Sequence, residues 1–300
     1  MQDKRLNSKI SIVLPAYNEE ASIGDVIDSL VNRFPEAEVL VIDDCSSDKT
    51  FEIAEKSGAR IIRHKYNMGN GASIKTGARN AEGDILVFMD ADGQHDPRDI
   101  EPLLKGLAEG YEMVIGARDS NSQANKQRML GNKLLNKFAS LMTGRKIPDL
   151  TSGFRAVKAT SFREFIHLLP NGFSYPTTST MAYLRSGYPV LFVPIKAHKR
   201  IGKSNISFMK DGIRFLVVIM KVATLFSPMR LFFPASLLFF LLGLFRYSYF
   251  YLKTGNFSEM AGVMFITAIL VFLIGLISEQ ITALHYGISL RKTIDDMQKR

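Results

Sequence analysis

The sequence predicts a mostly parallel α/β sheet with helices on both faces, followed by a membrane-associated C-terminal part. In the first 120 residues, short apolar runs alternate with longer segments whose apolar residues recur at helical spacing. The short runs are almost continuously apolar, which is typical of parallel strands buried on both faces. Near the C-terminus, two segments are long and apolar enough to cross a bilayer as helices.

Four strands and the helices between them account for the first part of the chain. The strands are predicted at residues 10–14, 39–43, 85–89 and 113–116, and the helical segments at 19–34, 48–58, 71–83 and 97–110. In open parallel sheets, ligands bind beyond the carboxyl ends of the strands. We therefore expect the functional site in the segments that directly follow the strands.

Composition narrows the class of protein. The chain has 300 residues, of which 46% are apolar, and its formal net charge of +9 indicates a basic surface that faces an anionic partner. One cysteine, Cys45, excludes an internal disulfide and a cysteine zinc site, so we expect a reducing compartment. The first twenty residues hold no apolar stretch typical of a signal peptide, and we expect the N-terminal part to stay in the cytoplasm.

The stretch FMDADGQHDP, residues 88–97, places Asp90 and Asp92 directly after a predicted buried strand. An Asp-x-Asp pair at the carboxyl edge of a sheet can hold a divalent cation through oxygen ligands, and the cation can then bind a diphosphate. His95 offers a transition-metal alternative but lacks a partner at metal-ligand spacing. Because a lone Asp-x-Asp is also common in polar turns, the prediction depends on the polar residues that follow the two preceding strands.

The C-terminal part predicts a hairpin of two transmembrane helices, at about residues 231–252 and 261–284 within a region 229–290. Basic residues flank the hairpin on both sides, among them Lys221, Arg230, Arg291 and Lys292. The positive-inside rule then places the N-terminal region and a short tail, 291–300, in the cytoplasm, as in a multi-pass protein of the cytoplasmic membrane. Two buried helices of a soluble domain are the alternative.

Residues 206–228 precede the hairpin and carry Lys210, Arg214 and Lys221 on one helical face among apolar residues. This pattern is typical of an amphipathic helix in the membrane interface, although an ordinary packing helix shows it too. Pro228 ends the segment.

Five motifs together resemble a known family. They are SIVLPAYNEE, VLVIDDCSSDKT, the long run NMGNGASIKTGARNAEGDILVFMDADGQHDP, VIGAR and DLTSGFRAV, and they occur in order within residues 9–205. They resemble glycosyltransferase family 2, most closely its dolichyl- and polyprenyl-phosphate sugar transferase branch. The resemblance implies a nucleotide-diphosphosugar-binding catalytic domain of the GT-A type over residues 1–205. It also implies a nucleotide-sugar donor, a polyisoprenyl phosphate acceptor and a Mg²⁺ or Mn²⁺ cofactor.

The family pattern assigns roles to individual positions of this chain. The nucleotide-sugar-binding positions are Pro15, Tyr17, Glu19, Ile42, Asp44, Asp90, Ala91 and Asp92. The metal-holding positions are Asp92 and Gln94, and the basic residue near the phosphates is Arg118. Simpler roles remain open, because Pro15 and Asn18 favour turns and Asp48 is a good helix cap. The stretch NMGNGASIKTG lacks the spacing of a phosphate loop, so packing and nucleotide binding both remain open for it.

Two further elements resemble the acceptor side of the site. The first contains Asp149, Ser152 and Arg155, which would lie beside the donor sugar and the acceptor phosphate, with a structural ion pair as the alternative for Arg155. The second is HKRIGKSNIS, whose Lys199, Arg200 and Lys203 would meet a lipid phosphate or simply an anionic membrane surface. This chain departs from the branch pattern there, since Asn205 stands where lysine is common.

The expected reaction is direct displacement with inversion, because a phosphate monoester is already largely ionised near pH 7, with a second pKa of about 6. The groups expected to carry catalysis are Asp90, Asp92, Arg118 and Arg200. A UDP-sugar is the favoured donor and GDP-mannose the alternative. A processive polysaccharide synthase is disfavoured, because that class resembles a pattern ending in Gln-x-x-Arg-Trp and this chain has no Trp. A catalytically silent membrane scaffold is the alternative from another class. We expect no nucleic-acid partner, and a homo-oligomer through the C-terminal helices is an open expectation.

Overall fold

The computed structural model describes residues 8–118, 126–172, 174–196, 220, 224 and 227–298, with side chains except at 126–131 and 285–298. The chain forms two compact units, Met1–Asp211 and Gly212–Arg300. The amphipathic segment predicted at 206–228 lies almost entirely outside the described residues, and so do Lys199, Arg200 and Lys203.

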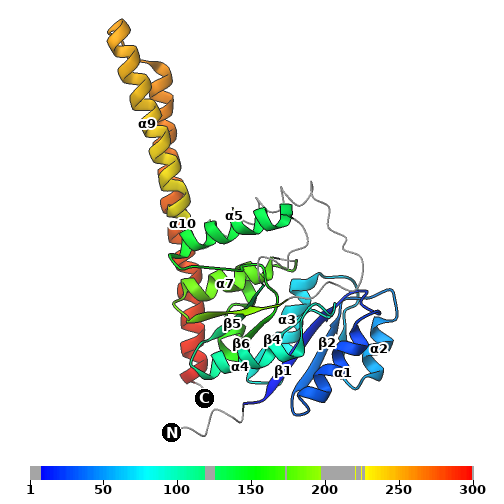
Figure 1. The fold of residues 1–300 in the computed structure, drawn as a ribbon. Helices are drawn as coiled ribbons and strands as arrows, with labels where there is room; N and C mark the ends of the chain where they lie inside the picture. The colour runs from blue at the N-terminus through cyan, green and yellow to red at the C-terminus, as the bar shows by residue number, and fades with distance from the viewer. Residues whose placement is uncertain are drawn as a thin grey trace. The chain divides into compact units, whose positions relative to one another are not determined.

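The first unit is built on a seven-stranded sheet with the order β3-β2-β1-β4-β6-β5-β7 (Figure 1). Its strands are β1 Ile10–Ala16, β2 Glu38–Asp43, β3 Arg60–Arg63, β4 Ile85–Phe88, β5 Met113–Arg118, β6 Arg155–Lys158 and β7 Val190–Ile195. Strands β1 to β4 pair in parallel, and β7 pairs in parallel with β5. Only β6 runs against its neighbours β4 and β5. The four predicted strands and the mostly parallel sheet are confirmed.

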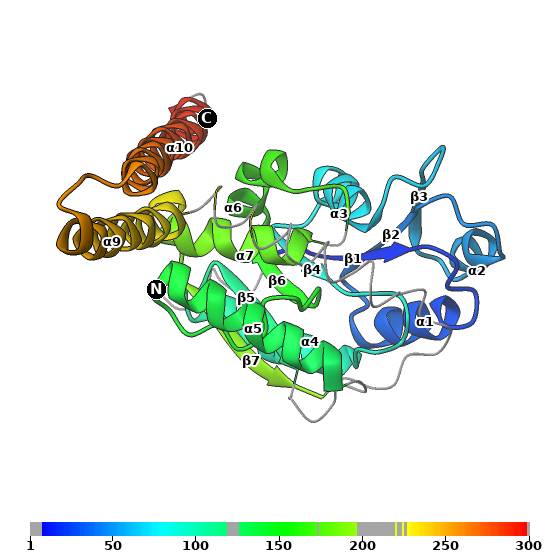
Figure 2. The same ribbon diagram turned by 90° about the horizontal axis from the view of Figure 1, so that it is seen from above.

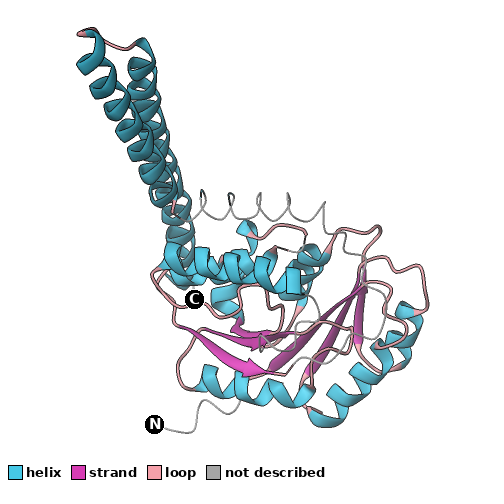
Figure 3. Ribbon diagram, turned by 45° about the horizontal axis from the view of Figure 1, so that its top comes forward, coloured by secondary structure: helices cyan, strands magenta, loops and turns pink. Residues whose placement is uncertain are grey.

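Helices cover both faces of the sheet (Figure 3). They are α1 Ile23–Arg33, α2 Thr50–Lys56, α3 Asn70–Asn80, η1 Pro97–Asp99, α4 Ile100–Ala108, α5 Lys126–Thr143, α6 Ala159–Glu164, η3 Ile166–Leu168 and α7 Tyr175–Arg185. Seen from above, α1 and α4 lie on one side of the sheet and α3 and α6 on the other (Figure 2). The predicted two-layered covering is therefore present.

Strand alternation divides the core between the two faces. Ile12 and Leu14 of β1 belong to the buried cluster that also contains apolar residues of α1 and α4. On the opposite face, Val13 meets α3 at Gly77, where an added Cβ would overlap the Val13 side chain. Glycine at this position therefore lets α3 approach β1 closely, which fixes where the start of α3 lies at the carboxyl edge.

The second unit contains two long helices, α9 Pro228–Thr254 and α10 Glu259–Gln298. Residues Pro228–Thr254 and Glu259–Leu284 are each long and apolar enough to cross a membrane. The two helices touch at small residues, since an added Cβ on Gly275 would lie 2.7 Å from Cβ of Phe232. Ser236 Oγ also donates a hydrogen bond of 2.9 Å to the Ala268 carbonyl. The predicted helical hairpin is present. Its first helix is slightly longer than expected, whereas α10 continues well beyond the predicted end at residue 284 and includes most of the tail predicted at 291–300.

The start of α9 has a side-chain partner on α10. The backbone N–H of Met229, in the first turn of α9, donates to the Glu279 carboxylate over 3.3 Å. A carboxylate at a helix N-terminus satisfies an otherwise unpaired N–H and interacts favourably with the helix dipole. Glu279 and its neighbour Gln280 are polar residues within the second apolar segment, and this contact accounts for the first of them.

Candidate active site at the carboxyl edge of the sheet

The loops after β1 and β2 are fastened to each other by hydrogen bonds. Asn18, at a φ of +55°, donates its backbone N–H to Ser46 Oγ over 3.0 Å and accepts from the Ser47 N–H over 2.9 Å. The N–H of Glu19 donates to Thr50 Oγ1 over 2.8 Å. Asn18 therefore has the turn-forming role that was left open, while the neighbouring Tyr17 is 48% exposed at the rim of the edge.

Asp44 is buried and holds the segment that leads into α3. Its carboxylate accepts hydrogen bonds from the N–H groups of Met68 and Gly69, each over 2.8 Å, and lies 2.7 Å from Nδ1 of His64. Nε2 of His64 in turn lies 2.9 Å from Oγ1 of Thr76. The carboxylate that the sequence assigns to the base or ribose thus has internal partners as well. The neighbouring predicted position Ile42 is fully buried in β2.

The glycine-rich stretch is required by packing. Gly69 has a φ of +96°, and a Cβ there would lie 2.6 Å from the carbonyl oxygen of Asn171. A Cβ on Gly71 would overlap the Pro170 carbonyl, and the N–H of Ala72 donates to the Asn171 carbonyl over 3.0 Å. Of the two roles left open by the sequence, close packing against residues 170–172 is the one that this geometry favours.

The Asp-x-Asp element follows β4 at the middle of the same edge. Asp92 is 6% exposed, and its Oδ1 accepts the N–H of Gln94 over 3.1 Å across a turn in which Gly93 has a φ of +72°. Ser22 Oγ holds the buried Ala91 through its carbonyl over 2.8 Å. Gly153 leaves room beside Asp90, because an added Cβ would lie 3.3 Å from Oδ2 of Asp90.

The donor set at this turn fits a hard divalent cation. Asp92 and Gln94 offer carboxylate and amide oxygens, which Mg²⁺ and Mn²⁺ accept. Within the described residues, no group of three His, Cys, Asp or Glu side chains is placed to hold a metal. The protein would therefore contribute few ligands, and substrate phosphates would complete the coordination, as Mg²⁺ sites commonly do.

Arg118 and Asp149 form an ion pair across the ends of β5 and the segment before β6. Nε and Nη2 of Arg118 donate to Asp149 over 2.8 and 3.1 Å, and the backbone N–H of Arg118 donates over 3.2 Å. Burial alone would raise the pKa of Asp149, but the hydrogen bonds and charge of Arg118 hold that pKa below its usual value. Burial would lower the pKa of Arg118, but its hydrogen bond to Asp149 and the charges of Asp149, Asp90 and Asp92 together raise that pKa.

His95 follows the Asp-x-Asp turn and packs on Phe154, the residue before β6. Its ring stacks on Phe154 with centroids 4.7 Å apart and an interplanar angle of 14°. Burial lowers the pKa of His95 to about 4, with Asp92 and Asp149 opposing that shift and Arg118 adding to it. The imidazole is therefore neutral near pH 7. The sequence suggested His95 only as a metal ligand, and its contact with Phe154, 59 positions away, has no sequence signal.

Ser152 and Arg155 lie away from any open surface. Ser152 is buried, and its Oγ donates to the Gly116 carbonyl over 2.6 Å. Arg155 is fully buried in β6 and donates to Ser179 Oγ and Thr180 Oγ1 of α7 over 2.8 and 3.1 Å. This placement favours a structural role for Arg155 over phosphate binding, although its partners are neutral oxygens rather than the carboxylate of an ion pair.

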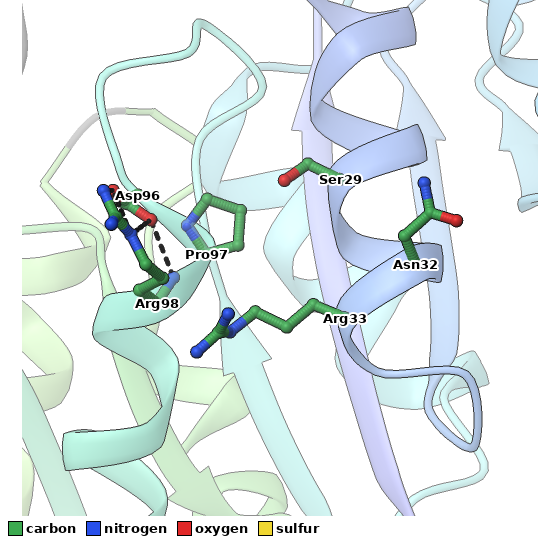
Figure 4. Close-up of a pocket in the computed structure, with 6 residues that line it drawn as sticks. All are labelled: Ser29, Asn32, Arg33, Asp96, Pro97 and Arg98. Carbon is green, nitrogen blue, oxygen red and sulfur yellow. Dashed lines mark hydrogen bonds and ion pairs between the residues drawn. The ribbon is translucent and has the colours of Figure 1, made fainter.

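A pocket on the α1 side of the unit is separate from these residues (Figure 4). It is lined by Ser29, Asn32 and Arg33 of α1 and by Asp96, Pro97 and Arg98. Both arginines are ion-paired, Arg33 with Glu101 over 2.7 Å and Arg98 with Asp96 over 2.6 Å. None of the predicted site residues lines this pocket.

Comparison with known proteins decides the family. The sequence model described as glycosyl transferase family 2 matches residues 11–166, more than half of the chain. The chain belongs to glycosyltransferase family 2. A second model, the GtrB C-terminal hairpin, matches residues 227–284 of this glycosyltransferase and covers both apolar helices. The resemblance to the polyprenyl-phosphate branch is thereby confirmed, and the hairpin match supports membrane association.

Individual proteins are similar over different lengths of this glycosyltransferase. Glycosyltransferase AglJ of Haloferax volcanii is 29% identical over 293 residues, covering 92% of this chain and 94% of its own. Dolichol-phosphate mannosyltransferase of Pyrococcus furiosus is 32% identical over 178 residues, covering 55% of this chain and 50% of its own. Glucosyl-3-phosphoglycerate synthase of Mycobacterium tuberculosis, solved with Mn²⁺, UDP and its product, superposes with a TM-score of 0.57 at 22% identity, covering 73% of this chain and 78% of its own. That likeness shows the shared fold.

Proposed function

We propose that this glycosyltransferase transfers a sugar from a nucleotide-diphosphate sugar to a polyisoprenyl phosphate at the cytoplasmic face of the membrane. The observation that carries the proposal is the presence, on one chain, of a family 2 domain and a GtrB-type hairpin. The hairpin supports a lipid acceptor. The relative from Pyrococcus furiosus, whose name specifies dolichol phosphate, supports the same acceptor class.

Residues at the carboxyl edge supply the donor side of the mechanism. Asp92 and Gln94 would hold Mg²⁺ or Mn²⁺, which when bound neutralises charge on the diphosphate. Tyr17, on the exposed rim, and Asp44, beside the start of α3, would contact the nucleoside. Asp90 lies near Arg118 and would contact the donor at the start of the Asp-x-Asp element.

The acceptor phosphate acts as the nucleophile. One of its oxygens attacks the anomeric carbon, the bond from that carbon to the diphosphate oxygen breaks, and the nucleoside diphosphate leaves with the electron pair. The configuration at carbon therefore inverts. Because the phosphate is largely ionised near pH 7, no general base and no covalent glycosyl-enzyme are needed. Arg118 would stabilise charge on the phosphates, and Asp149 would orient Arg118 and accept from a sugar hydroxyl.

The basic segment with Lys199, Arg200 and Lys203 lies outside the described residues. We propose that it meets the lipid phosphate at the membrane surface, where attraction between basic side chains and anionic headgroups is strong. Both chain termini would then lie in the cytoplasm, because basic residues flank the hairpin on both sides.

The donor is proposed as a UDP-sugar, which the UDP complex of the structural neighbour supports. A GDP-mannose-dependent polyprenyl-phosphate mannose synthase is the second candidate, supported by the name of the relative from Pyrococcus furiosus. The two donors differ in base and sugar, so one assay with both separates them.

A product assay tests the proposal. The protein purified in detergent is incubated with undecaprenyl phosphate, Mg²⁺ or Mn²⁺, and a panel of UDP- and GDP-sugars, with Asp92→Ala as control. A lipid-extractable sugar product from one donor, absent with Asp92→Ala, is the expected result and identifies the donor. Donor hydrolysis without lipid product would exclude the acceptor. An absence of turnover with every donor would favour a catalytically silent membrane scaffold.

A further inference from the structure

We propose that Tyr175 is a positioning residue for the Asp-x-Asp element, because its hydroxyl holds the Gly153 backbone against the Asp90 carboxylate. This inference rests on the proposed function, in which Asp90 contacts the donor. Tyr175 opens α7 and belongs to none of the motifs by which the family is recognised. Its connection to the site exists only in the folded chain.

The hydroxyl of Tyr175 is a fixed donor to the backbone beside the site. Tyr175 is 1% exposed, and its hydroxyl donates to the Gly153 carbonyl over 3.1 Å. A phenol has one proton to donate, and here the Gly153 carbonyl accepts it. Burial raises the pKa of Tyr175, with Arg155 opposing and Asp90 adding to that shift, so the hydroxyl keeps its proton near pH 7.

Gly153 brings this hydroxyl and the Asp90 carboxylate to the same small space. A Cβ added to Gly153 would lie 3.2 Å from the Tyr175 hydroxyl oxygen, and 3.3 and 3.6 Å from Oδ2 and Oδ1 of Asp90. Both carboxylate oxygens therefore lie close over the Gly153 backbone. Because interiors are close-packed, the position of that backbone limits where the carboxylate can lie. A group that fixes Gly153 therefore also fixes one wall of the space that Asp90 occupies.

Helix α7 is itself attached to the segment that contains Gly153. Arg155, which is fully buried, donates to the Ser152 carbonyl and, over 2.8 Å, to Ser179 Oγ of α7. Its guanidinium carbon lies 5.7 Å from the centroid of the Tyr175 ring. Tyr175 is thus part of an element held to this segment by a second buried side chain, and a hydrogen bond from such an element can set the position of a loop carbonyl.

Tyr183 offers a matched control on the same helix. It is also fully buried, and its hydroxyl shares a hydrogen bond of 3.0 Å with Ser161 Oγ. Ser161 lies in α6, directly after β6, and β6 runs against β4 and β5. Its end therefore lies at the edge of the sheet opposite to Asp90. Phenylalanine at position 175 or 183 removes one buried hydroxyl from α7, at the site edge in the first case and at the opposite edge in the second.

The full-length variants Tyr175→Phe and Tyr183→Phe are compared in detergent with the wild type. Thermal unfolding is measured, together with KM and kcat for transfer to undecaprenyl phosphate from the donor that the product assay identifies. Tyr175→Phe should lose about tenfold in kcat, because small displacements around reacting groups are costly in rate. Tyr183→Phe should keep nearly the wild-type kcat. Both should unfold at similarly lowered temperatures, since each loses one buried hydrogen bond.

A double variant provides a readout that a merely structural role would not change. The methyl group of Gly153→Ala meets both the Tyr175 hydroxyl and Asp90, and Tyr175→Phe removes the first of these contacts. The methyl group can then move toward the vacated position and away from the carboxylate. Tyr175→Phe combined with Gly153→Ala should therefore retain more transfer than the product of the two single losses predicts.

Equal kcat in Tyr175→Phe and Tyr183→Phe would overturn the proposal, and so would a double variant whose loss equals or exceeds the product of the single losses. Failure of the proposed function is recognised separately, since the wild-type protein would then transfer no sugar to lipid. In that case calorimetric binding of Mn²⁺ with UDP-glucose and with GDP-mannose decides. Weaker binding in Tyr175→Phe than in Tyr183→Phe supports the positioning role, and equal binding overturns it.

Discussion

Arg118 and Asp149 share three hydrogen bonds, two from the guanidinium over 2.8 and 3.1 Å and one from the Arg118 backbone over 3.2 Å. Asp149 is almost fully buried, and the guanidinium also donates to Thr151 Oγ1 over 2.8 Å. The pair therefore fixes the end of β5 to the segment before β6. It leaves a rigid cation beside Asp90 and Asp92, where the leaving diphosphate is proposed to lie.

Removal of either partner should leave the other charge buried and unpaired. We expect Asp149→Asn and Arg118→Met each to destabilise the fold by about 3 kcal/mol. The double variant should be less destabilised than the sum of the two, because it leaves no unpaired charge. Chemical unfolding of the four proteins in detergent measures this coupling. Additive effects would show that the pair contributes no coupling energy.

The same pair should produce a pH dependence of stability. The pKa of Asp149 is lower in the folded protein than in the unfolded chain, so the unfolded state binds the proton more readily. Its contribution is therefore present above the unfolded pKa and is lost as the pH falls through the lowered folded value. Unfolding temperatures recorded from pH 7 down to about pH 3 should fall less steeply for Asp149→Asn than for the wild type, since the unfolded pKa of an aspartate is about 3.9. Parallel curves would contradict the assignment.

Gly153 should be intolerant of a side chain for a reason specific to the site. An added Cβ would lie 3.2 Å from the hydroxyl of Tyr175 and 3.3 Å from Oδ2 of Asp90. Tyr175 is fully buried and donates to the Gly153 carbonyl over 3.1 Å, so we expect the Asp90 carboxylate to be displaced by a few tenths of an ångström. We expect Gly153→Ala to lower transfer by about tenfold or more with little loss of stability, because small displacements of reacting groups are costly in rate.

Gly172→Ala is the matched control for that substitution, since its added Cβ would meet no atom within 4 Å in the described part of the chain beyond its sequence neighbours. Both variants are assayed for sugar transfer and for unfolding temperature. Equal activity in the two variants would show that Asp90 tolerates the shift.

Substitutions of Asp44 and Tyr17 should differ in their effects on stability and nucleotide binding. Asp44→Ala removes the acceptor of two buried N–H groups and the partner of His64, so we expect a loss of about 3 kcal/mol of stability together with weaker nucleotide binding. Tyr17→Ala alters an exposed side chain and should weaken nucleotide binding alone. Unfolding temperature and calorimetric binding of Mn²⁺ with UDP, measured side by side, distinguish the two. An unchanged unfolding temperature in Asp44→Ala would contradict the structural part of its role.

Much of the fold could be predicted because buried parallel strands are recognisable as almost continuously apolar runs in the sequence. Strands β1, β2, β4 and β5 are apolar runs buried on both faces, and the motifs follow them directly. Strand β3 has arginine at both ends and forms an edge, so it resembles a polar loop. Strand β6 begins with Arg155, a fully buried cation that donates hydrogen bonds to Ser179 and Thr180 of α7. A prediction that places every charged residue at the surface misses such a strand.

The positions of the site residues could be predicted from the sequence, but their interaction partners could not. Asp90, Asp92 and Asp44 follow their strands as expected, because the sheet alone places them. The pairing of Arg118 with Asp149 joins residues 31 positions apart through the antiparallel strand that the sequence did not reveal. The stacking of His95 on Phe154 depends on that same strand. Long-range partners of this kind follow from topology, which local periodicity does not encode.

Helix α10 continues without a break from Glu259 to Gln298, whereas its apolar part ends at Leu284. At 1.5 Å per residue its 40 residues extend about 60 Å, roughly twice the hydrocarbon thickness of a bilayer. A helix with no interruption has no hinge, so its C-terminal end and its apolar part tilt and rotate together. A spectroscopic label near the C-terminus would therefore act as a pointer for the orientation of the apolar part, without any probe inside the lipid.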